Sequence, residues 1–501
     1  MQRQRTMISV ILLLSILLTS CGSAGSSDNP DATTENTDTE TIAEETTTAD
    51  TSPDPKLEPV DCGGKEYNIL SREIDGYTFP YSEFYSEEQN GDIINDAVYE
   101  RNRYIEDKYN LRLNVTELKR TEFASGAKRS ISAGDSDYDL VFPMVADAFS
   151  MSLDGLFLNV NDIPHIDAEM PWWRKSILED VSIGGRNYFI IGDLNLSSLN
   201  DVGVVYFNKD LAAQRNITDI YDTVRAGKWT IDRFSEYCKG VTSDVNGDTV
   251  LNGDDMFGLT CNAFCWQPLF AGTDSLIIEK DKDDKPYLAW GSERNMAVMG
   301  KIIGLLNDRS STILVNQFPE LEDAGGWGNA SIKMFTEDRA LFWIEIIYGV
   351  LQLRDMNTDF GLLPMPKYDD NQANYTSYMH TSNASTCCVP VTSGDTDLAG
   401  RILTDMAYMS YKTIRPAYYE KTLKGKASRD EESGGMLDII YSDIRLDLTF
   451  AMVFSGLPID DTMRSAAIKN VTDLASMIEK KKSACEKIID KNADKILSLD
   501  H

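Results

Sequence analysis

The sequence predicts an α/β protein with two lobes. Segments typical of strands and helices alternate from about residue 61 onward, which is the order of a parallel sheet connected by crossover helices. The chain has 501 residues, and the roughly 440 that follow the N-terminal leader and linker exceed the ~250 to 300 at which a single hydrophobic core stops growing. Two cores are therefore expected.

The first five elements of the body carry this alternation. KEYNILSRE and LRLNVTEL alternate apolar and polar residues, as strands do. Between them, a helix is predicted from the helical spacing of Ile94, Val98, Tyr99 and Ile105. A second helix around FASGAKRSISAG and a short apolar strand in DSDYDLVFPM complete the series. Later strands are expected at RNYFIIG, VGVVYFN, FGLLP and STCCVPV.

Amphipathic helices are expected at the C-terminus, from about Arg464 onward. The apolar residues that share one face of this segment are Ile468, Val471, Leu474, Ile478, Cys485 and Ile488.

The N-terminus has the features of an export signal. The apolar run at residues 8–18 follows Arg3 and Arg5, and it is far too short to span a bilayer, which takes roughly 20 apolar residues. The sequence Leu-Thr-Ser-Cys that ends at Cys21 resembles a bacterial lipobox, in which the cysteine receives lipid and becomes the first mature residue. We therefore expect a lipid anchor on the extracellular face of the cell membrane. A plain secretory signal, with Cys21 incidental, is the alternative.

An acidic linker is predicted to follow Cys21. Residues 22–60 are rich in Ser, Thr, Asp and Glu and contain four prolines, so they cannot bury enough apolar surface to offset the entropy of ordering. Such a segment is typical of a disordered spacer between lipid and folded body. The formal net charge of −32 makes nucleic acid a poor partner.

The loop DVNGDTVLNGDD has the spacing of a calcium-binding loop. Its oxygen side chains fall at loop positions 1, 3, 5, 9 and 12, with a backbone carbonyl at position 7, as in twelve-residue loops that hold Ca²⁺. The predicted ligands are Asp244, Asn246, Asp248, Val250, Asn252 and Asp255. Thr249 replaces the usual glycine at position 6, and Asp255 is shorter than the usual glutamate. Two solvated Asn-Gly turns are the alternative to a structural calcium ion.

Several segments of the body resemble one known family. They are YDLVFPMVADAFSMSLDGLFLNVND, IGGRNYFIIGDLNLSSLNDVGVVYFNKDL with its Asn208-Lys209 ending, MFTEDRALFWIE, FGLLPMPK and the C-terminal PAYYEKTLKGKASRDEESGGMLDII. Together they span most of residues 64–490. On these segments the chain resembles the extracellular solute-binding proteins of ABC importers, in the sugar-binding group that includes the maltodextrin-binding proteins.

This resemblance implies a two-lobe, periplasmic-binding-protein-like fold of type II, with a ligand cleft between the lobes. The implied organisation is a signal peptide (1–20), the lipidated Cys21 and linker (21–60), the first part of lobe 1 (61–200), lobe 2 (201–375), a return segment of lobe 1 (376–430) and C-terminal helices (431–501). The implied function is capture of a carbohydrate for ABC permease transmembrane subunits, by a monomeric receptor that breaks no bond in its ligand.

The resemblance also implies ligand-binding residues, because open sheets bind ligands at the carboxyl ends of their strands. Aligned with the family, these positions are Met144, Asp147, Asp201, Asn262, Trp266, Trp343, Glu345 and Tyr348. Trp172 and Trp173 are further candidates from residue chemistry alone. A sugar ring packs its C–H face on an aromatic ring, and its hydroxyls need carboxylates and amides. For each tryptophan, core packing is the alternative role.

Two other function classes remain open. An exported lipoprotein glycoside hydrolase would use two of the 80 acidic residues as a carboxyl pair. A purely structural surface protein would need repeats in the body, and none is visible. Few residues are available for other catalytic chemistries, because the chain has three histidines and no Gly-x-Ser-x-Gly, His-Glu-x-x-His or glycine-rich phosphate loop. Peptide or polyamine ligands are alternatives to sugar within the same fold.

Overall fold

The computed structural model describes residues 53–75, 81–322, 328–419 and 431–500. Pro53–His501 form one compact unit with its own hydrophobic core. The predicted signal peptide, Cys21 and most of the predicted linker lie outside the described residues. Within the described residues, no helix is long and apolar enough to cross a membrane.

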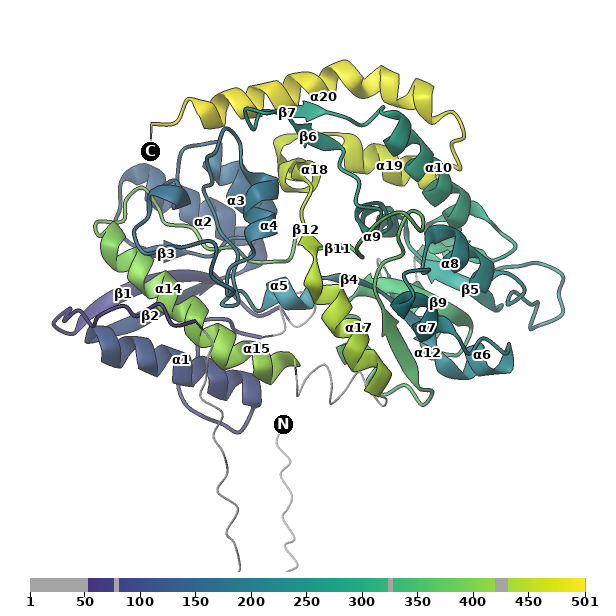
Figure 1. The fold of residues 1–501 in the computed structure, drawn as a ribbon, viewed down its shortest axis with the longest axis horizontal. Helices are drawn as coiled ribbons and strands as arrows, with labels where there is room; N and C mark the ends of the chain where they lie inside the picture. The colour runs from purple at the N-terminus through teal and green to yellow at the C-terminus, as the bar shows by residue number, and fades with distance from the viewer. Residues whose placement is uncertain (1–52, 76–80, 323–327, 420–430, 501) are drawn as a thin grey trace, which may run out of the picture. The chain divides into compact units, whose positions relative to one another are not determined.

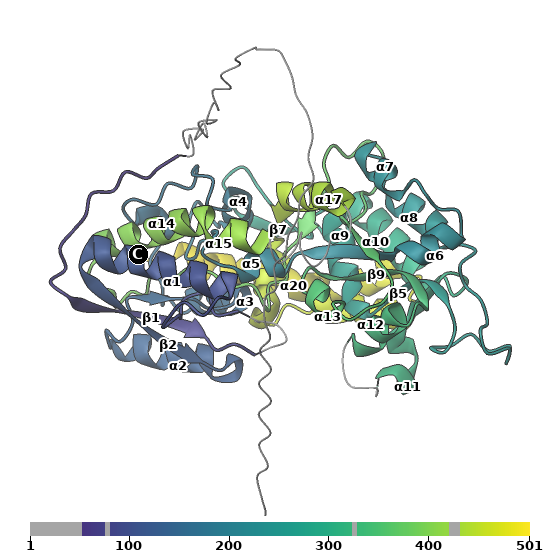
Figure 2. The same cartoon turned by 90° about the horizontal axis from the view of Figure 1, so that it is seen from below.

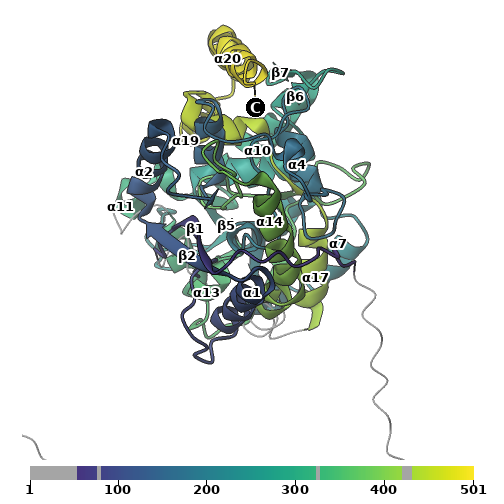
Figure 3. The same cartoon turned by 90° about the vertical axis from the view of Figure 1, so that its left-hand side faces the viewer.

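Lobe 1 is built on a parallel three-stranded sheet in the order β2-β1-β3. Its strands are β1 (Lys65–Arg72), β2 (Leu111–Leu118) and β3 (Leu140–Val141). Helices α1 (Ile93–Tyr109) and α2 (Arg120–Ala133) lie on opposite sides of the β1–β2 pair (Figures 1 and 3). The strand, helix, strand, helix, strand order predicted for this region is confirmed.

Helix α1 shows how local sequence sets these elements. The Asp92 carboxylate caps its first turn by accepting hydrogen bonds from the amides of Ile94 and Asn95, each at 3.0 Å. The helix ends where Asn110 adopts a left-handed conformation, with φ of 43°. Ile94, Val98 and Ile105 face the core, as their spacing predicts, whereas Tyr99 of the same set is half-buried.

A late segment of the chain completes lobe 1. Helix α14 (Thr396–Lys412) packs beside α1 (Figures 1 and 2). The buried Asp405 carboxylate of α14 accepts hydrogen bonds from the Tyr109 hydroxyl at 2.6 Å and from Lys108 at 2.7 Å. This segment falls inside the return segment, residues 376–430, that the sequence predicts.

Lobe 2 is built on a mixed five-stranded sheet in the order β10-β4-β9-β5-β8. Its strands are β4 (Gly203–Asn208), β5 (Phe257–Cys261), β8 (Thr312–Leu314), β9 (Ala340–Ile346) and β10 (Phe360–Leu363). Strand β5 is parallel to its neighbours β8 and β9, whereas β4 is antiparallel to β9 and β10. The parallel β5 and β9 therefore end at the same edge of the sheet, which positions the site described below.

The two lobes are joined by segments that lie side by side. The chain leaves lobe 1 through α5 (Ser197–Asn200) and enters β4, and it returns after β11 (Ser377–Tyr378). The backbone amide of His380 donates to the carbonyl of Asp201 at 2.9 Å, and Val202 pairs with Met379. Strand β11 also pairs with β12 (Ile444–Arg445), which is the third contact in this region.

Further helices cover these sheets and connect the strands. Up to residue 272 they are α3 (Val145–Ser152), α4 (Lys175–Val181), α6 (Lys209–Gln214), α7 (Ile220–Arg225), α8 (Ile231–Cys238) and α9 (Trp266–Gly272). Later in the chain they are α10 (Glu293–Asn307), α11 (Pro319–Glu322), α12 (Asn329–Thr336), α13 (Gly349–Gln352), α15 (Ile414–Pro416) and α17 (Glu431–Ser442). Strands β6 (Ile278–Lys280) and β7 (Pro286–Leu288) form a separate hairpin.

The C-terminal helices are shared between the lobes. Helix α18 (Leu448–Ala451) packs against α3 and α4 of lobe 1, whereas α19 (Ile459–Ile468) packs against α10 of lobe 2. The last helix, α20 (Leu474–Leu497), lies against β7 and α10 (Figure 1). The predicted amphipathic face is present in α20, but Ile489 takes the buried position expected for Ile488, which is only partly buried.

The prediction of a strand is wrong for two segments. RNYFIIG and STCCVPV form isolated bridges only, such as Ile190 with Cys387 and Val141 with Cys388. The second segment lies between two different partners, β3 on one side and the first segment on the other, so neither pairing extends along its length. Both nonetheless widen the lobe 1 sheet by single residues.

Candidate functional site

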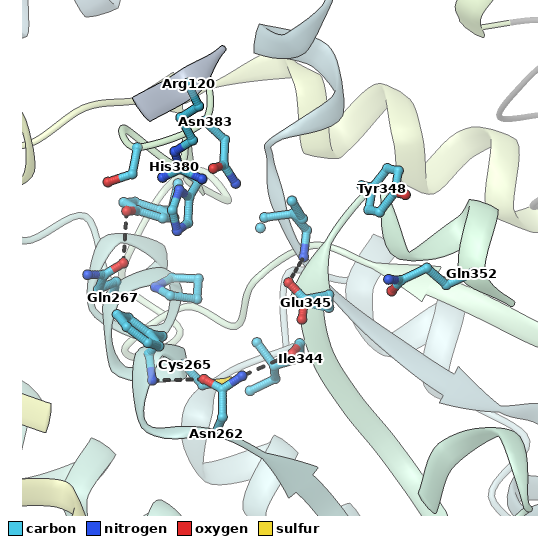
Figure 4. A pocket seen from close by; sticks show the side chains of 16 residues that line it. Arg120, Asn262, Cys265, Gln267, Ile344, Glu345, Tyr348, Gln352, His380 and Asn383 are labelled. Atoms are coloured by element: carbon cyan, nitrogen blue, oxygen red, sulfur yellow. Dashed lines mark hydrogen bonds between the residues drawn. The ribbon is translucent and has the colours of Figure 1, made fainter. Parts of the chain in front are cut away.

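A cavity of about 340 Å³ opens beside the crossing segments and is lined by residues of both lobes. Figure 4 shows its side chains. Lobe 2 contributes residues that follow β5 and β9, whereas lobe 1 contributes the start of α2. The polar residues that line it are Arg120, Asn262, Gln267, Glu345, Gln352, His380, Ser382 and Asn383.

Asn262, Gln267 and Glu345 form one side of the cavity, which we name the lobe 2 wall. Asn262 directly follows β5 and Glu345 lies near the end of β9, so the parallel pairing of these strands brings the two side chains together. The Asn262 side-chain oxygen accepts from the Phe264 amide at 2.9 Å, which fixes the side chain and leaves its NH₂ group for a ligand.

Glu345 is the carboxyl group of this wall. One of its oxygens accepts a hydrogen bond from the Ile346 amide at 3.0 Å. Burial disfavours the charged form and raises the pKa of Glu345 to about 7. Near neutral pH this group therefore exists both as a carboxylate, which accepts hydrogen bonds, and as an acid, which also donates one.

The lobe 2 wall is braced from behind by the buried Asp460 of α19. One Asp460 oxygen accepts from the Gln267 amide at 2.7 Å and from the Trp266 indole at 2.9 Å. The other oxygen pairs with Arg464 at 2.9 Å. The Gln267 oxygen in turn accepts from the Tyr378 hydroxyl at 2.9 Å, so Gln267 is held in one orientation.

Arg120, His380, Ser382 and Asn383 form the opposite side, which we name the basic wall. Arg120 is the first residue of α2, directly after β2, and Figure 4 shows it beside His380 and Asn383. The buried Arg72 guanidinium donates to the Asn383 carbonyl at 3.1 Å and so positions this wall from behind. Burial lowers the pKa of His380 to about 4, so its ring is neutral at pH 7.

Aromatic rings complete the lining. Phe264 and Tyr348 are half-buried at the cavity. The Arg464 guanidinium lies 4.5 Å from the centroid of the Phe264 ring and holds the ring by a cation–π contact. Tyr378 is buried, with its hydroxyl directed to Gln267. The cavity thus combines apolar ring surface with fixed polar groups, as small-ligand sites do.

Three of the predicted ligand residues, Asn262, Glu345 and Tyr348, are brought together at this cavity. The predicted tryptophans lie elsewhere. Trp266 and Trp343 are buried in lobe 2, where Trp266 packs against Phe450 and Trp343 against Tyr206. The structure gives these rings packing roles.

Trp172 and Trp173 are buried in the core of lobe 1, where Trp172 packs against Tyr408 of α14. Met144 is also buried, and its backbone pairs with Ser385. None of the three is among the residues that line the cavity.

Asp147 and Asp201 lie behind the basic wall. Asp147 is half-buried in the first turn of α3, and burial raises its pKa to about 6, against the influence of Arg120 and Arg72. Asp201 is fully buried in the crossing segment, and burial raises its pKa well above the usual carboxyl range. Neither is among the residues that line the cavity.

Sequence reasoning missed the basic wall and Gln267. Arg120 could have been found, because it follows a predicted strand and so lies at the carboxyl end of the lobe 1 sheet. His380, Ser382 and Asn383 belong to a crossing segment with no strand or helix pattern of its own. Their contact with the cavity depends on how the segment passes between the sheets.

The calcium-like loop has its carboxylates turned toward its own backbone. Asp244 accepts from the amides of Gly247 and Thr249 at 2.6 and 2.8 Å, and Asp255 accepts from those of Val245 and Asn252 at 2.9 and 3.0 Å. Thr249 has a positive φ of 69°, the conformation that glycine supplies in such loops. Among the described residues, no group of three or more His, Cys, Asp and Glu is placed to hold a metal ion. Calcium stays a prediction.

The comparisons with known proteins identify the fold. No family model matches the sequence, and no curated protein matches it. Among solved structures, the cyclic α-maltosyl-1,6-maltose binding protein of Arthrobacter globiformis matches with a TM-score of 0.56 at 10% identity, over 85% of this chain and 99% of that one. A cyclo/maltodextrin-binding protein complexed with maltotetraose matches with a TM-score of 0.54 at 11% identity, over 87% and 98%.

UgpB from Mycobacterium tuberculosis, in complex with glycerophosphocholine, also matches, with a TM-score of 0.53 at 14% identity, over 79% of this chain and 95% of that one. Identities this low establish the fold and leave the ligand open. The chain therefore has the α/β, two-lobe, type II fold of the solute-binding proteins that serve ABC importers.

Proposed function

We propose that this protein is a lipid-anchored extracellular receptor that captures a carbohydrate for an ABC importer. The observation that supports this function best is the cavity itself, which lies between residues of the two lobes and joins fixed hydrogen-bonding groups to aromatic surface. The names of several solved structures with this fold mention maltodextrin-type sugars. This supports a sugar as the first ligand class to test.

The chemistry of the lining fits a sugar. Hydroxyl groups both donate and accept hydrogen bonds, and Glu345, with the NH₂ group of Asn262, offers the complementary acceptor and donor. Tyr348 and Phe264 offer ring surface for the C–H face of a pyranose. Held side chains lose little conformational entropy on binding, which favours affinity.

Binding is favoured over hydrolysis. Glycoside hydrolases ordinarily place two carboxyl groups across the scissile bond. Among the described residues that line the cavity, only Glu345 carries a carboxyl group. We therefore place glycoside hydrolysis second, and the recovery of intact sugar after binding tests it directly.

The proposed cellular setting combines the sequence features. Cys21 would hold the chain at the outer face of the cell membrane, and the linker would separate the receptor from the lipid. ABC permease subunits are the proposed protein partners, with the receptor acting as a monomer. Replacement of Cys21 by alanine should release the protein from the membrane fraction into the medium. Retention of the C21A variant in the membrane would contradict lipid anchoring.

The first experiment is thermal unfolding of Pro53–His501 with a panel of mono- and oligosaccharides. A ligand at 100 times its Kd adds about 2.7 kcal/mol to the unfolding free energy. Each kcal/mol raises Tm by roughly 2 to 4 °C in a domain of about 150 to 250 residues. A sugar that raises Tm by several degrees and is recovered unchanged supports the receptor. If it is recovered cleaved, the hydrolase replaces the receptor. If no sugar raises Tm, carbohydrate is the wrong ligand class.

A further inference from the structure

The two walls of the cavity differ in charge. The lobe 2 wall carries one carboxyl group, Glu345, and the basic wall carries the Arg120 guanidinium. No ion pair joins them, although both groups line the same cavity. A ligand that fills this space therefore meets hydrogen-bond acceptors at one end and a cation at the other.

Arg120 has no ion-pair partner in the described part of the chain, although the protein has 80 acidic and 48 basic residues. Other arginines of the fold pair closely, such as Arg174 with Asp193 at 2.7 Å and Arg445 with Asp180 at 2.6 Å. The Arg120 side chain is exposed, so it meets the cavity solvent as a free cation. An Arg in this setting is a natural site for a planar anion, because its fork of N–H donors matches two oxygens.

The groups around Arg120 leave this positive charge largely in place. His380 is neutral at pH 7. Behind the wall lie three acids, Asp147, Asp201 and Glu83, and a further cation, Arg72. Asp201 has a pKa well above the usual range, Asp147 has a pKa of about 6, and Arg72 lies close enough to influence both. Burial favours the neutral form of all three acids, and the one with a pKa of about 6, Asp147, faces two guanidinium groups.

We propose that the ligand is an anionic sugar, whose carboxylate or phosphate binds Arg120 and whose hydroxyl groups bind Glu345 and Asn262. This assignment rests on the proposed carbohydrate-binding function and names its ligand class. The net charge of −32 does not oppose it, because interactions beyond the Debye length of about 8 Å are screened at physiological salt and the nearby guanidinium dominates.

The test compares sugars that differ only in the anionic group, with binding to Pro53–His501 measured by titration calorimetry. The pairs are galacturonate with galactose, glucuronate with glucose, and glucose 6-phosphate with glucose, together with the 1,4-linked disaccharides of galacturonate and galactose. We expect at least one anionic sugar to bind tenfold or more tightly than its neutral parent. The uronate and phosphate arms then distinguish the two sources of the anion.

Arg120→Gln should lower the affinity for the anionic sugar tenfold or more and change the affinity for the neutral parent by less than threefold. Arg112→Gln is the matched control, because Arg112 is an exposed arginine of β2 that does not line the cavity. An equal loss in both variants, or no loss in Arg120→Gln, overturns the assignment to Arg120. Neutral sugars that bind as tightly as anionic ones overturn this inference and leave the proposed function standing. If no sugar binds, both this inference and the proposed carbohydrate-binding function are wrong.

Discussion

The two walls of the cavity are each braced by one buried carboxyl group, and the two braces differ. Asp460, behind the lobe 2 wall, pairs with the Arg464 cation and accepts from the Gln267 and Trp266 side chains. The carboxyl group of Glu83, behind the basic wall, accepts hydrogen bonds from neutral donors. It accepts from the amide of Ser197 at 2.6 Å and from the hydroxyls of Ser197 and Ser385 at 2.8 and 2.5 Å.

This difference follows from where each brace lies. Asp460 lies on α19, which packs onto lobe 2, so the lobe 2 wall is fixed within one lobe. Glu83 joins the outgoing segment at Ser197 to the returning segment at Ser385, two residues beyond Asn383. The basic wall is therefore tied to the segments that connect the lobes. We infer that lobe movement displaces the basic wall more than the lobe 2 wall.

The largest expected effect comes from removing the lobe 2 brace. Asp460→Ala removes one of the two carboxylate partners of Arg464 and leaves two buried donors without their acceptor, and loss of one partner from a buried pair costs about 3 to 5 kcal/mol of unfolding free energy. Urea unfolding measures this loss of unfolding free energy. Asp461→Ala is the matched control, since the Asp461 side chain is 82% exposed although it also contacts Arg464. It should cost less than about 0.5 kcal/mol. Equal losses in the two variants would show that the brace is unimportant.

The second effect concerns Glu345 and depends on pH. Its ordinary pKa is 4.5, and its pKa in the fold is about 7, so the folded chain holds this proton where the unfolded chain has released it. The unfolding free energy therefore falls as pH rises from about 4.5 to 7 and is level above that. Glu345→Gln should remove this loss and stabilise the protein by about 3 kcal/mol at pH 8, but not at pH 4. Unfolding at the two pH values measures it, and a pH-independent difference would contradict it.

The same Glu345→Gln variant should bind sugar more weakly, because a carboxylate at a binding site is retained for the ligand at a cost in stability. Calorimetry with the best sugar found for the parent chain measures the loss. A variant that is more stable and binds equally well would remove Glu345 from the site.

A smaller effect is expected at the brace of the basic wall. Glu83→Gln keeps one acceptor oxygen but loses the hydrogen bond from one serine hydroxyl, which costs about 1 kcal/mol. Glu88→Gln, an exposed neighbour, should leave the unfolding free energy unchanged. A loss as large as that of Asp460→Ala would mean that the two braces are equivalent, and the comparison between the walls would fail.

The smallest effect tests the calcium prediction at residues 244–255. If this loop binds Ca²⁺, calcium at a free concentration equal to Kd adds about 0.4 kcal/mol to the unfolding free energy, and a chelator removes it. Asp244→Asn should abolish the gain, whereas Asp254→Asn, an exposed neighbour outside the predicted ligand set, should keep it. Equal unfolding curves with calcium and with chelator would leave the loop as a pair of turns.

Sequence alone determined the elements whose signals are local. The strand at residues 65–72 and the helix at residues 93–109 were predictable, because apolar periodicity and the Asp92 cap act within the segment. The same holds for Asn262 and Glu345, which the family resemblance implies and which lie at strand ends.

Tertiary structure decided the rest. The sequence could not separate a ligand platform from core packing for Trp172, Trp173, Trp266 and Trp343, because a large ring satisfies either role and only the surrounding residues select one. The basic wall likewise depends on contacts between segments far apart in the chain, such as Arg72 with the Asn383 carbonyl, 311 residues later. Local pattern carries no information about such pairs, because their energy arises only when the two crossing segments lie side by side.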